Sequence, residues 1–462
     1  MPLQQIKSAQ VSDLLPGITV EGLSTNQLNY RNNSAVNVIE RATTSANVWS
    51  NTISGGGNIT FPNMIRGDTS LRTICGGYDN IIGRAYASFP GDGNATIATQ
   101  ILGGAHNRIF LNGSADQVPT AFAVNTGTIQ PSHGTITGGS YHQIRNGDYG
   151  IIGGGTNCVI QEIVAYNDYA SGTGAVIAGG FLNEANGNYC VIGGGNTNTV
   201  ENVNSVVGGG LLNSITQAKD STPSPMSANV IGGGSTNTIN CASSATIGGG
   251  QLNAISSGSG TTSRGLAGVI AGGYNNSIGS TAASTYAVVS GGSGNKANTH
   301  YTAIVGGSDN EISGQWSVGC GQQAKTGLWG ALTQGGGQTT TKGDAQSSVI
   351  VLKRTTTNAT TTVLFTQGNL LFIPSATTWA FRCMVVGRTA GGVAGAFEIK
   401  GAIHTGAIIG TPTSVSMGAD AGAATWTATG NYNANTLEIR VTGAAATTIN
   451  WVGRLELTEV TF

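Results

Sequence analysis

A ten-residue phrase recurs along the middle of this 462-residue chain and constrains its fold more than any other feature. The phrase is an aliphatic pair, a free position, Gly-Gly, two free positions, Asn, a free position and an aliphatic residue. Val230–Ile239 (VIGGGSTNTI) and Val269–Ile278 (VIAGGYNNSI) are two clear copies. About thirteen copies lie between Ile53 and Ile312, at intervals as short as 15 residues. Such a repeat is the signature of a solenoid, in which each copy forms one coil.

The length of the interval decides which secondary structure a coil can contain. Fifteen residues are too few for a strand, a helix and two connections, but they can hold two strands of about 4 to 5 residues joined by tight turns. The aliphatic positions can then stack from coil to coil and form the core. The sequence therefore predicts an all-β solenoid with about 15 residues per coil and parallel neighbouring strands, in which the longer intervals contain inserted loops.

Glycine and asparagine occupy the positions where the coil must turn. The Gly-Gly step suits a corner that needs a positive φ or a close backbone approach. The repeated Asn suits a turn in which its amide bonds to the backbone or to the Asn one coil above. We therefore predict a structural ladder of asparagines, in which His142 once replaces Asn. The predicted members are Asn80, Asn107, Asn157, Asn183, Asn198, Asn213, Asn237, Asn253, Asn276, Asn295 and Asn310.

Nucleotide-binding loops also contain clustered glycines, but those loops open a helix. Here no helical pattern follows any of the glycine pairs, so nucleotide binding is not predicted. The chain has 20 basic and 21 acidic residues and no basic cluster, which argues against a nucleic-acid partner. It has no apolar signal core at its start and no run of 18 apolar residues, so we expect synthesis in a cytoplasm and no membrane insertion.

The residues that most often bind metals are not arranged for that purpose. The six cysteines lie mostly beside aliphatic residues without CxxC spacing, so we expect buried free thiols. The five histidines lack HxH and HxxxH spacing, so we predict no metal and no cofactor. Only a threefold axis could bring three copies of His106 or of His142 together around an ion.

Composition divides the chain into four predicted parts. Residues 1–45 lack the repeat and are interpreted as a virion-attachment segment, and residues 46–330 carry the solenoid with its loop insertions. Residues 331–346 are interpreted as a neck or cap over the end of the solenoid. Residues 347–462 replace the glycine pairs with alternating segments such as Leu437–Val441, which predicts an antiparallel β-sandwich at the tip.

The repeated wording VIGGGxxNxI resembles the YadA-like head repeat of trimeric autotransporter adhesins over some 270 residues. The resemblance implies a left-handed parallel β-roll in which three chains pack as a homotrimer. Two departures affect the functional expectation. The chain shows no signal peptide, heptad stalk or membrane anchor, and many of its coils carry insertions.

The last 110 or so residues resemble a C-terminal domain found at the ends of phage tail fibres and tailspikes. The resemblance is carried by Trp379, Val386–Arg388, Ala396–Ile399, Trp426, Leu437–Gly443 and Ile449–Val452. It implies a bacteriophage tail fibre, located in the virion tail and assembled in the host bacterial cytoplasm. Its expected partners are other tail or baseplate proteins at the N-terminus and a host surface glycan or protein.

We therefore predict a receptor-binding adhesin that is not an enzyme and has no catalytic residues. Exposed aromatic side chains on loops are common sugar platforms, which makes Tyr166, Tyr169, Tyr286 and Tyr432 the candidate receptor-binding residues. Packing against the roll or a neighbouring chain is an equally simple interpretation of each tyrosine.

The alternative is a tailspike depolymerase that cleaves host surface polysaccharide, which usually requires two carboxylates about 5 to 9 Å apart. The only acidic neighbourhood in the middle coils contains Glu162, Asp168, Glu184 and Glu201, and solvated outward side chains explain these residues more simply. A self-cleaving chaperone and an ice-binding protein fit the sequence poorly.

Overall fold

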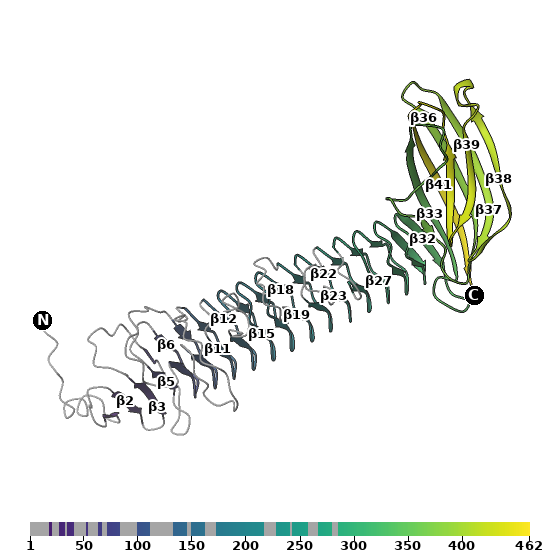
Figure 1. The fold of residues 1–462 in the computed structure, drawn as a ribbon. Helices are drawn as coiled ribbons and strands as arrows, with labels where there is room; N and C mark the ends of the chain where they lie inside the picture. Colours follow the sequence, from purple (N-terminus) through teal and green to yellow (C-terminus); the bar gives the residue numbers. More distant parts are fainter. Residues whose placement is uncertain are drawn as a thin grey trace. The chain divides into compact units, whose positions relative to one another are not determined.

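The computed structural model describes only part of the chain. It covers strands within residues 18–20, 27–32, 35–40, 52–53 and 63–66, and the segments 72–83, 99–110, 133–145, 149–161, 172–216, 228–240, 243–256, 267–279 and 285–462. The chain divides into two compact units, Met1–Ser244 and Ala245–Phe462. The described residues of both units are β-strands and turns, with one short 3-10 helix, η1 (Ala421–Ala423) (Figure 1). The predicted all-β class is confirmed, and none of the described segments forms a helix that could cross a membrane.

The first unit contains two ladders of short strands that run parallel from coil to coil. After the antiparallel strands β1 (Ile18–Val20) and β2 (Gln27–Asn32), one ladder starts at β3 (Ala35–Glu40), which pairs in parallel with β5 (Asn63–Arg66). It continues through β7 (Ile81–Gly83), β9 (Arg108–Phe110), β11 (Gln143–Arg145), β13 (Val159–Gln161), β15 (Glu184–Ala185), β17 (Thr199–Val200), β19 (Ser214–Thr216) and β21 (Thr238–Asn240).

The second ladder of this unit supplies the other side of each coil. Its strands are β4 (Thr52–Ile53), β6 (Arg72–Ile74), β8 (Thr99–Ile101), β10 (Thr135–Ile136), β12 (Ile151–Ile152), β14 (Val176–Ile177), β16 (Val191–Ile192), β18 (Val206–Val207) and β20 (Val230–Ile231). The two ladders stack as successive rungs in Figure 1.

The strands of the coil are shorter than the sequence analysis predicted. Most have two or three residues, as in β14 and β16, instead of 4 to 5. The glycine corner begins immediately after the buried aliphatic residue, so the strand ends there. A third, single-residue contact joins the coils beyond this corner, as in the parallel bridges that link Phe181, Asn196 and Leu211. Where this bridge is described, a coil therefore makes three parallel contacts with its neighbour.

One aliphatic side chain from each strand points into the coil and forms the core. Ile177 and Ile192 of the second ladder face inward and are fully buried, as is Val200 of the first ladder. The preceding residue points outward, as Val176 and Val191 do, because side chains alternate along a strand. The core of the described coils is thus a stack made mainly of isoleucine and valine, with Ala185 as the inward residue of β15.

The second unit repeats this arrangement and then changes to an antiparallel fold. Its two parallel ladders are formed by β22 (Thr246–Ile247), β24 (Val269–Ile270), β26 (Val288–Val289), β28 (Ala303–Ile304), β30 (Val318–Gln322) and β32 (Ala331–Gly336), and by β23 (Ala254–Ser256), β25 (Ser277–Ile278), β27 (Lys296–Ala297), β29 (Glu311–Ile312) and β31 (Lys325–Thr326). The change occurs at β32, which is parallel to β30 on one side and antiparallel to β33 (Ala345–Thr356) on the other.

Two antiparallel sheets follow, as predicted for the C-terminal part. β33 continues the larger sheet through β41 (Ile449–Thr461), β36 (Thr377–Thr389), β37 (Ala394–His404) and β38 (Ala407–Ala419). The smaller sheet contains β34 (Thr362–Val363), β35 (Leu371–Phe372), β39 (Thr427–Asn433) and β40 (Thr436–Thr442), with β40 pairing the other three. Trp379, Trp426 and Trp451 lie in the shared core.

A buried carboxyl group lies near one end of the larger sheet. Glu459 of β41 accepts hydrogen bonds from the Ser348 hydroxyl (2.5 Å) and from Nε1 of Trp379 (2.9 Å). Gln346 donates a longer bond of 3.4 Å. Burial raises the pKa of Glu459, and these neutral donors only partly oppose that effect. Folding therefore shifts the protonation equilibrium of Glu459 toward the neutral form relative to the unfolded chain.

We predict that Glu459→Gln stabilises this unit at neutral and higher pH. The pKa of the carboxyl group is raised in the folded protein, so its contribution to stability is greatest below the unfolded value and is lost as the pH rises through the folded value. The neutral amide removes this loss, which we expect to raise the free energy of unfolding by about 1 kcal/mol at pH 8. Scanning calorimetry at pH 4 and pH 8 measures the difference.

Glu456→Gln is the matched control, since Glu456 lies on the same strand and pairs with the exposed Arg454. A surface substitution of this kind changes stability by less than about 0.5 kcal/mol. Equal effects of the two substitutions at pH 8 would show that the buried carboxyl group does not destabilise the fold.

Candidate functional site

A column of buried asparagines runs beside the glycine corner of the coils. In a typical rung, the backbone N–H of Asn198 donates to Oδ1 of Asn183, the Asn of the preceding coil, at 3.0 Å. The Asn198 amide donates to the carbonyl oxygens of Gly194 at 2.9 Å and of Gly210, in the next coil, at 3.0 Å. A Cβ on Gly195 would lie 2.1 Å from the Gly210 oxygen, so only glycine allows the coils to approach this closely.

Ten of the eleven predicted ladder positions are fully buried, and the exception is Asn157. Cys158 lies in the column in its place and donates its backbone N–H to His142 Nδ1 at 3.2 Å. The predicted position was wrong because the run Gly153–Gly155 permits two choices of glycine pair, and the pair that forms the corner is the second. Asn63 also lies in the column and accepts from the backbone of Asn80 at 3.1 Å, although no glycine pair precedes it. Asn63, Met64 and Ile65 match the last three positions of the repeat, an Asn, a free position and an aliphatic residue, and this match could have identified Asn63 from the sequence.

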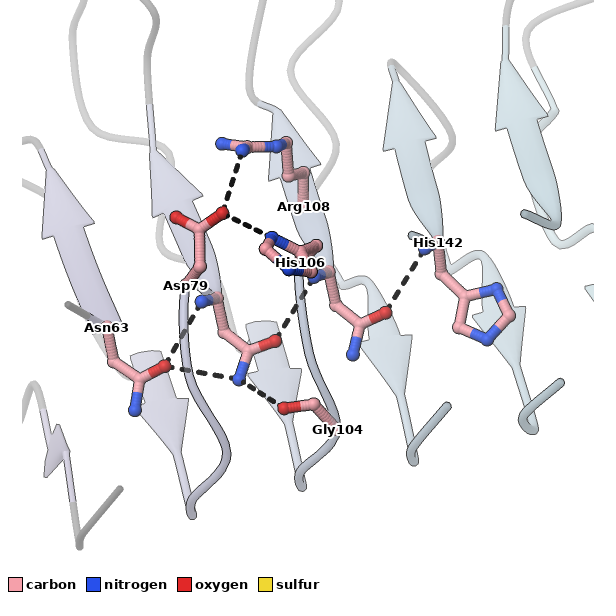
Figure 2. A network of polar contacts seen from close by, with 8 residues as sticks. Asn63, Asp79, Gly104, His106, Arg108 and His142 are labelled. Atoms are coloured by element: carbon pink, nitrogen blue, oxygen red, sulfur yellow. Dashed lines mark hydrogen bonds and ion pairs between the residues drawn. The ribbon is translucent and has the colours of Figure 1, made fainter. Parts of the chain in front are cut away.

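His142 occupies one position of the column but forms fewer hydrogen bonds than an asparagine does there (Figure 2). Its backbone N–H donates to Oδ1 of Asn107 at 3.1 Å, as an asparagine in this position does. Because Nδ1 accepts from Cys158, the neutral ring carries its proton on Nε2, which has no hydrogen-bond partner among the described residues. Burial lowers the pKa of His142. The ring lies inside its own coil, so three copies cannot meet around an ion on a symmetry axis.

The structure describes most of the cysteines and the other residues that could bind a metal ion. No group of three or more His, Cys, Asp or Glu within the described ranges is arranged to hold a metal ion. Cys158, Cys190 and Cys383 are buried, and burial raises the pKa of Cys190 and of Cys383 to about 12. Cys75 is exposed, contrary to the expectation, because it follows the inward Ile74 and points outward. Cys241 lies outside the described residues.

The coil also has a second corner, which lies immediately before the strands of the β22–β32 ladder. Tyr286, Tyr301 and Trp316 occupy this corner in three successive coils, with φ values of 55°, 56° and 55°. A left-handed backbone is unusual for bulky residues and costs about 1 to 2 kcal/mol for each of them. Their exposed fractions are 53, 47 and 43 %, so burial compensates for only part of this strain.

The three rings form an ordered stack with a fourth. The Tyr286 and Tyr301 ring centroids are 5.5 Å apart with an interplanar angle of 14°, and those of Tyr301 and Trp316 are 5.8 Å apart at 8°. Trp329 meets Trp316 edge to face at 5.4 Å. Parallel rings at these centroid distances are displaced sideways, because faces in contact lie about 3.5 to 4 Å apart. Part of each face is therefore uncovered. We call these four residues the aromatic column.

The predicted receptor-binding tyrosines have different surroundings. Tyr286 begins the aromatic column and lies at a corner of the coil, not in an insertion. Tyr432 packs against the C-terminal core, and its hydroxyl donates to Oδ1 of Asn435 at 2.7 Å in the adjacent turn. Tyr166 and Tyr169 lie outside the described residues. Tyr301 was not among the predicted receptor-binding residues, although it lies 15 residues after Tyr286, the length of one coil.

Of the four acidic residues considered for catalysis, only Glu184 and Glu201 lie among the described residues. Glu184 accepts hydrogen bonds from the Gln161 amide at 2.6 Å and from the Asn186 amide at 2.9 Å. Glu201 lies just after β17, the neighbour of the strand that holds Glu184. Glu162 and Asp168 lie outside the described residues. Glu184 therefore forms hydrogen bonds with amides of its own chain.

No protein-family model matches the chain, and no curated protein matches it. Three similar solved structures are phage tailspikes. The tailspike gp49 from Acinetobacter baumannii bacteriophage Fri1, a capsular polysaccharide depolymerase, has 9% identity and a TM-score of 0.22, with 89% of this chain and 72% of that chain covered. The Acinetobacter baumannii phage AM24 tailspike has 11% identity, a TM-score of 0.21 and coverages of 84% and 78%. The Acinetobacter phage vB_ApiP_P1 tailspike has 8% identity, a TM-score of 0.20 and coverages of 93% and 80%.

The comparison corrects one expectation from the sequence. The chain was predicted not to be an enzyme, and the first of these similar structures is a capsular polysaccharide depolymerase. The prediction of a non-enzymatic protein is therefore not retained. With TM-scores between 0.20 and 0.22, the likeness does not itself assign a depolymerase activity to this chain.

We predict that His142→Asn stabilises the first unit, because asparagine can complete the column with two further amide hydrogen bonds. The expected gain in the free energy of unfolding is about 1 to 2 kcal/mol at pH 7. The gain should increase as the pH falls below 6.5, since the folded state holds His142 neutral whereas the unfolded chain binds a proton there. Thermal unfolding at pH 5 and pH 7 measures both effects.

The reciprocal variant, Asn198→His, is the control for this prediction. It should destabilise the same unit, and more strongly at pH 5 than at pH 7. An unchanged melting temperature in both variants would mean that the amide column contributes little to stability.

Proposed function

We propose that this protein is a bacteriophage tail fibre or tailspike component that binds host surface polysaccharide along the aromatic column. The observation that carries the proposal is the placement of Tyr286, Tyr301 and Trp316 at exposed, left-handed corners of successive coils. Left-handed corners recur in other coils, at Tyr189 and Leu212 for example, so the ordered, partly uncovered stack of rings is what distinguishes these three residues. Under this proposal the protein belongs to the virion tail, is assembled in the host bacterial cytoplasm, and uses residues 1–45 to attach to tail or baseplate proteins.

Saccharides fit the chemistry of this surface. A sugar ring has apolar C–H faces that pack on aromatic rings and hydroxyl groups that bond to polar tips. Tyr and Trp combine an apolar body with a hydrogen-bonding tip, and their rings lose little conformational freedom on binding. The rings repeat at 5.5 to 5.8 Å along the column, which is similar to the length of one sugar residue in an extended chain. A linear polysaccharide could thus contact several rings in succession.

A depolymerase activity at this surface, the alternative already predicted from the sequence, is the second candidate. A bound polysaccharide could be a substrate as well as a receptor. The two outcomes differ in the products, because cleavage by hydrolysis releases new reducing ends whereas binding releases none. Among the described residues, we identify no pair of carboxylates that could carry out this hydrolysis.

We also propose that the chain is a homotrimer. The outward residues of the second ladder include Val176, Val191, Val206 and Val230, which form an aliphatic row only partly shielded by their own chain. Parallel sheets are normally covered on both faces, because both faces of their strands are apolar. Packing of this row against neighbouring copies of the chain would cover it.

Binding measurements with purified polysaccharides test the role of the aromatic column. Applied to an array of bacterial capsular and O-antigen polysaccharides, the purified protein should bind at least one of them, and Tyr301→Ala should weaken that binding by about tenfold. The fluorescence of Trp316 should change on binding in the same titration. Reducing ends released from the bound polysaccharide would assign the second candidate function.

Tyr189→Ala is the matched control for Tyr301→Ala. Tyr189 lies at the same type of corner, with φ 54° and an exposed fraction of 61 %, but it does not belong to the aromatic column. Its substitution should leave the affinity unchanged. The proposal fails if no polysaccharide binds, or if both variants bind as tightly as the wild-type protein.

The molar mass in solution tests the proposed homotrimer. Light scattering should give three times the chain mass of 46.5 kDa. Val191→Lys places a charge in the outward aliphatic row and should reduce the mass toward that of one chain, whereas Thr197→Lys, at a partly exposed left-handed corner, should not. A monomeric wild-type protein would contradict the proposed trimer.

A further inference from the structure

A second group of side chains, partly buried except for the exposed Tyr141, lies on the other corner of the coil, in the first unit. Asp79, His106 and Tyr141 each precede a residue of the buried column in three successive coils, and each has a positive φ between 52° and 59°. Arg108 follows on β9. Figure 2 shows the Asp79 carboxylate between the His106 ring and the Arg108 guanidinium.

One carboxylate oxygen holds the group together. Oδ2 of Asp79 lies 2.6 Å from Nδ1 of His106 and 3.2 Å from Nη2 of Arg108. The His106 ring is fixed from two further directions. It stacks on Tyr141 with centroids 4.6 Å apart at 12°, and it meets Tyr78 edge to face at 5.3 Å. The carboxylate and the guanidinium are therefore held in a defined relative orientation.

Part of the hydrogen-bonding capacity of the group faces outward. Within the described part of the chain, Oδ1 of Asp79 makes no hydrogen bond and Arg108 donates only through Nη2. A guanidinium carries five donors, and an ionised carboxylate has lone pairs on both oxygens. Tyr141 adds an aromatic surface that is 51 % exposed. The group therefore presents an acceptor, several donors and a ring on one corner.

The charges limit which ligand can use this combination. Asp79 and Arg108 carry opposite charges, so the pair is close to neutral overall. An anionic ligand would approach the Asp79 carboxylate unfavourably, and a cation would approach Arg108 unfavourably. A neutral group with adjacent donors and acceptors matches both residues. Two neighbouring hydroxyl groups of a sugar ring are such a group, because one can donate to Oδ1 while the other accepts from the guanidinium.

We infer that Asp79, Arg108 and Tyr141 form a binding site for a neutral pyranose, with a vicinal diol on the carboxylate and guanidinium and the C–H face of the sugar on Tyr141. His106 is a positioning residue that orients Asp79. This site lies in the first unit and extends the proposed polysaccharide binding to a second set of residues. It does not depend on the aromatic column.

The test is saturation-transfer NMR on the full-length protein with three probes, methyl α-D-mannopyranoside, methyl β-D-glucopyranoside and methyl β-D-glucuronide. The wild-type protein should transfer more saturation to the neutral probes than to the glucuronide. Asp79→Asn should reduce transfer to the neutral probes at least threefold and increase transfer to the glucuronide, because Arg108 then acts on the anion without an opposing charge. A merely structural ion pair would not produce this exchange of preference.

Asp309→Asn is the control, since Asp309 lies at the same type of corner in another coil with φ 54°. Its transfer should equal that of the wild-type protein, and thermal unfolding of all variants checks that they fold. No transfer to any probe, or the same preference in wild type and Asp79→Asn, would overturn the inference. If Tyr301→Ala abolishes transfer and Asp79→Asn does not, the aromatic column binds and this site does not. The reverse result would support this site and count against the aromatic column.

Discussion

The hydrogen bonds of the buried asparagine column set the register of the solenoid on which the rest of the structure depends. Each side chain in a typical rung links its own coil to the coils on both sides, as Asn198 does with Asn183 and with Gly210. A shift of one residue between coils would leave these amides unpaired in the interior, at roughly 1 to 3 kcal/mol for each group. The apolar stack favours association of the coils, and the amides determine which residues face each other.

The same constraint explains where side chains are free to vary. Both corners of the coil require a left-handed backbone, but the side chain at each corner points away from the core. The chain places Asn, Leu, Thr, Asp, His, Tyr and Trp there, as at Leu212, Thr197 and Trp316. These corners therefore align side chains of successive coils at a regular spacing without altering the interior. Both the aromatic column and the Asp79 group arise in this way.

The repeat predicted the fold class because its period, its aliphatic positions and its glycines each describe a local requirement of the coil. In the coil of Gly153–Gly155 the presence of Asn157 led to the wrong ladder position, although the aliphatic residues Ile152 and Ile160 fit the repeat only with Cys158 in the column. The aromatic column was missed for a different reason. Its members occupy a position that the repeat leaves free, so no fixed residue type marks it. Their 15-residue spacing is visible in the sequence, but the inward or outward direction of each ring depends on the backbone at the corner. The Asp79 group joins residues from three successive coils that lie far apart in the sequence, and contacts of that kind follow only from the three-dimensional register.

The three parallel contacts between neighbouring coils have a consequence for how such a chain can change over generations. Each coil offers the same backbone donors and acceptors to the coil on either side, so a duplicated or deleted stretch of one repeat leaves the flanking coils with equivalent partners. The number of coils can then vary while the C-terminal sandwich is retained. A lineage could in this way alter the number of stacked aromatic rings, and with it the length of polymer contacted, through changes in repeat number alone.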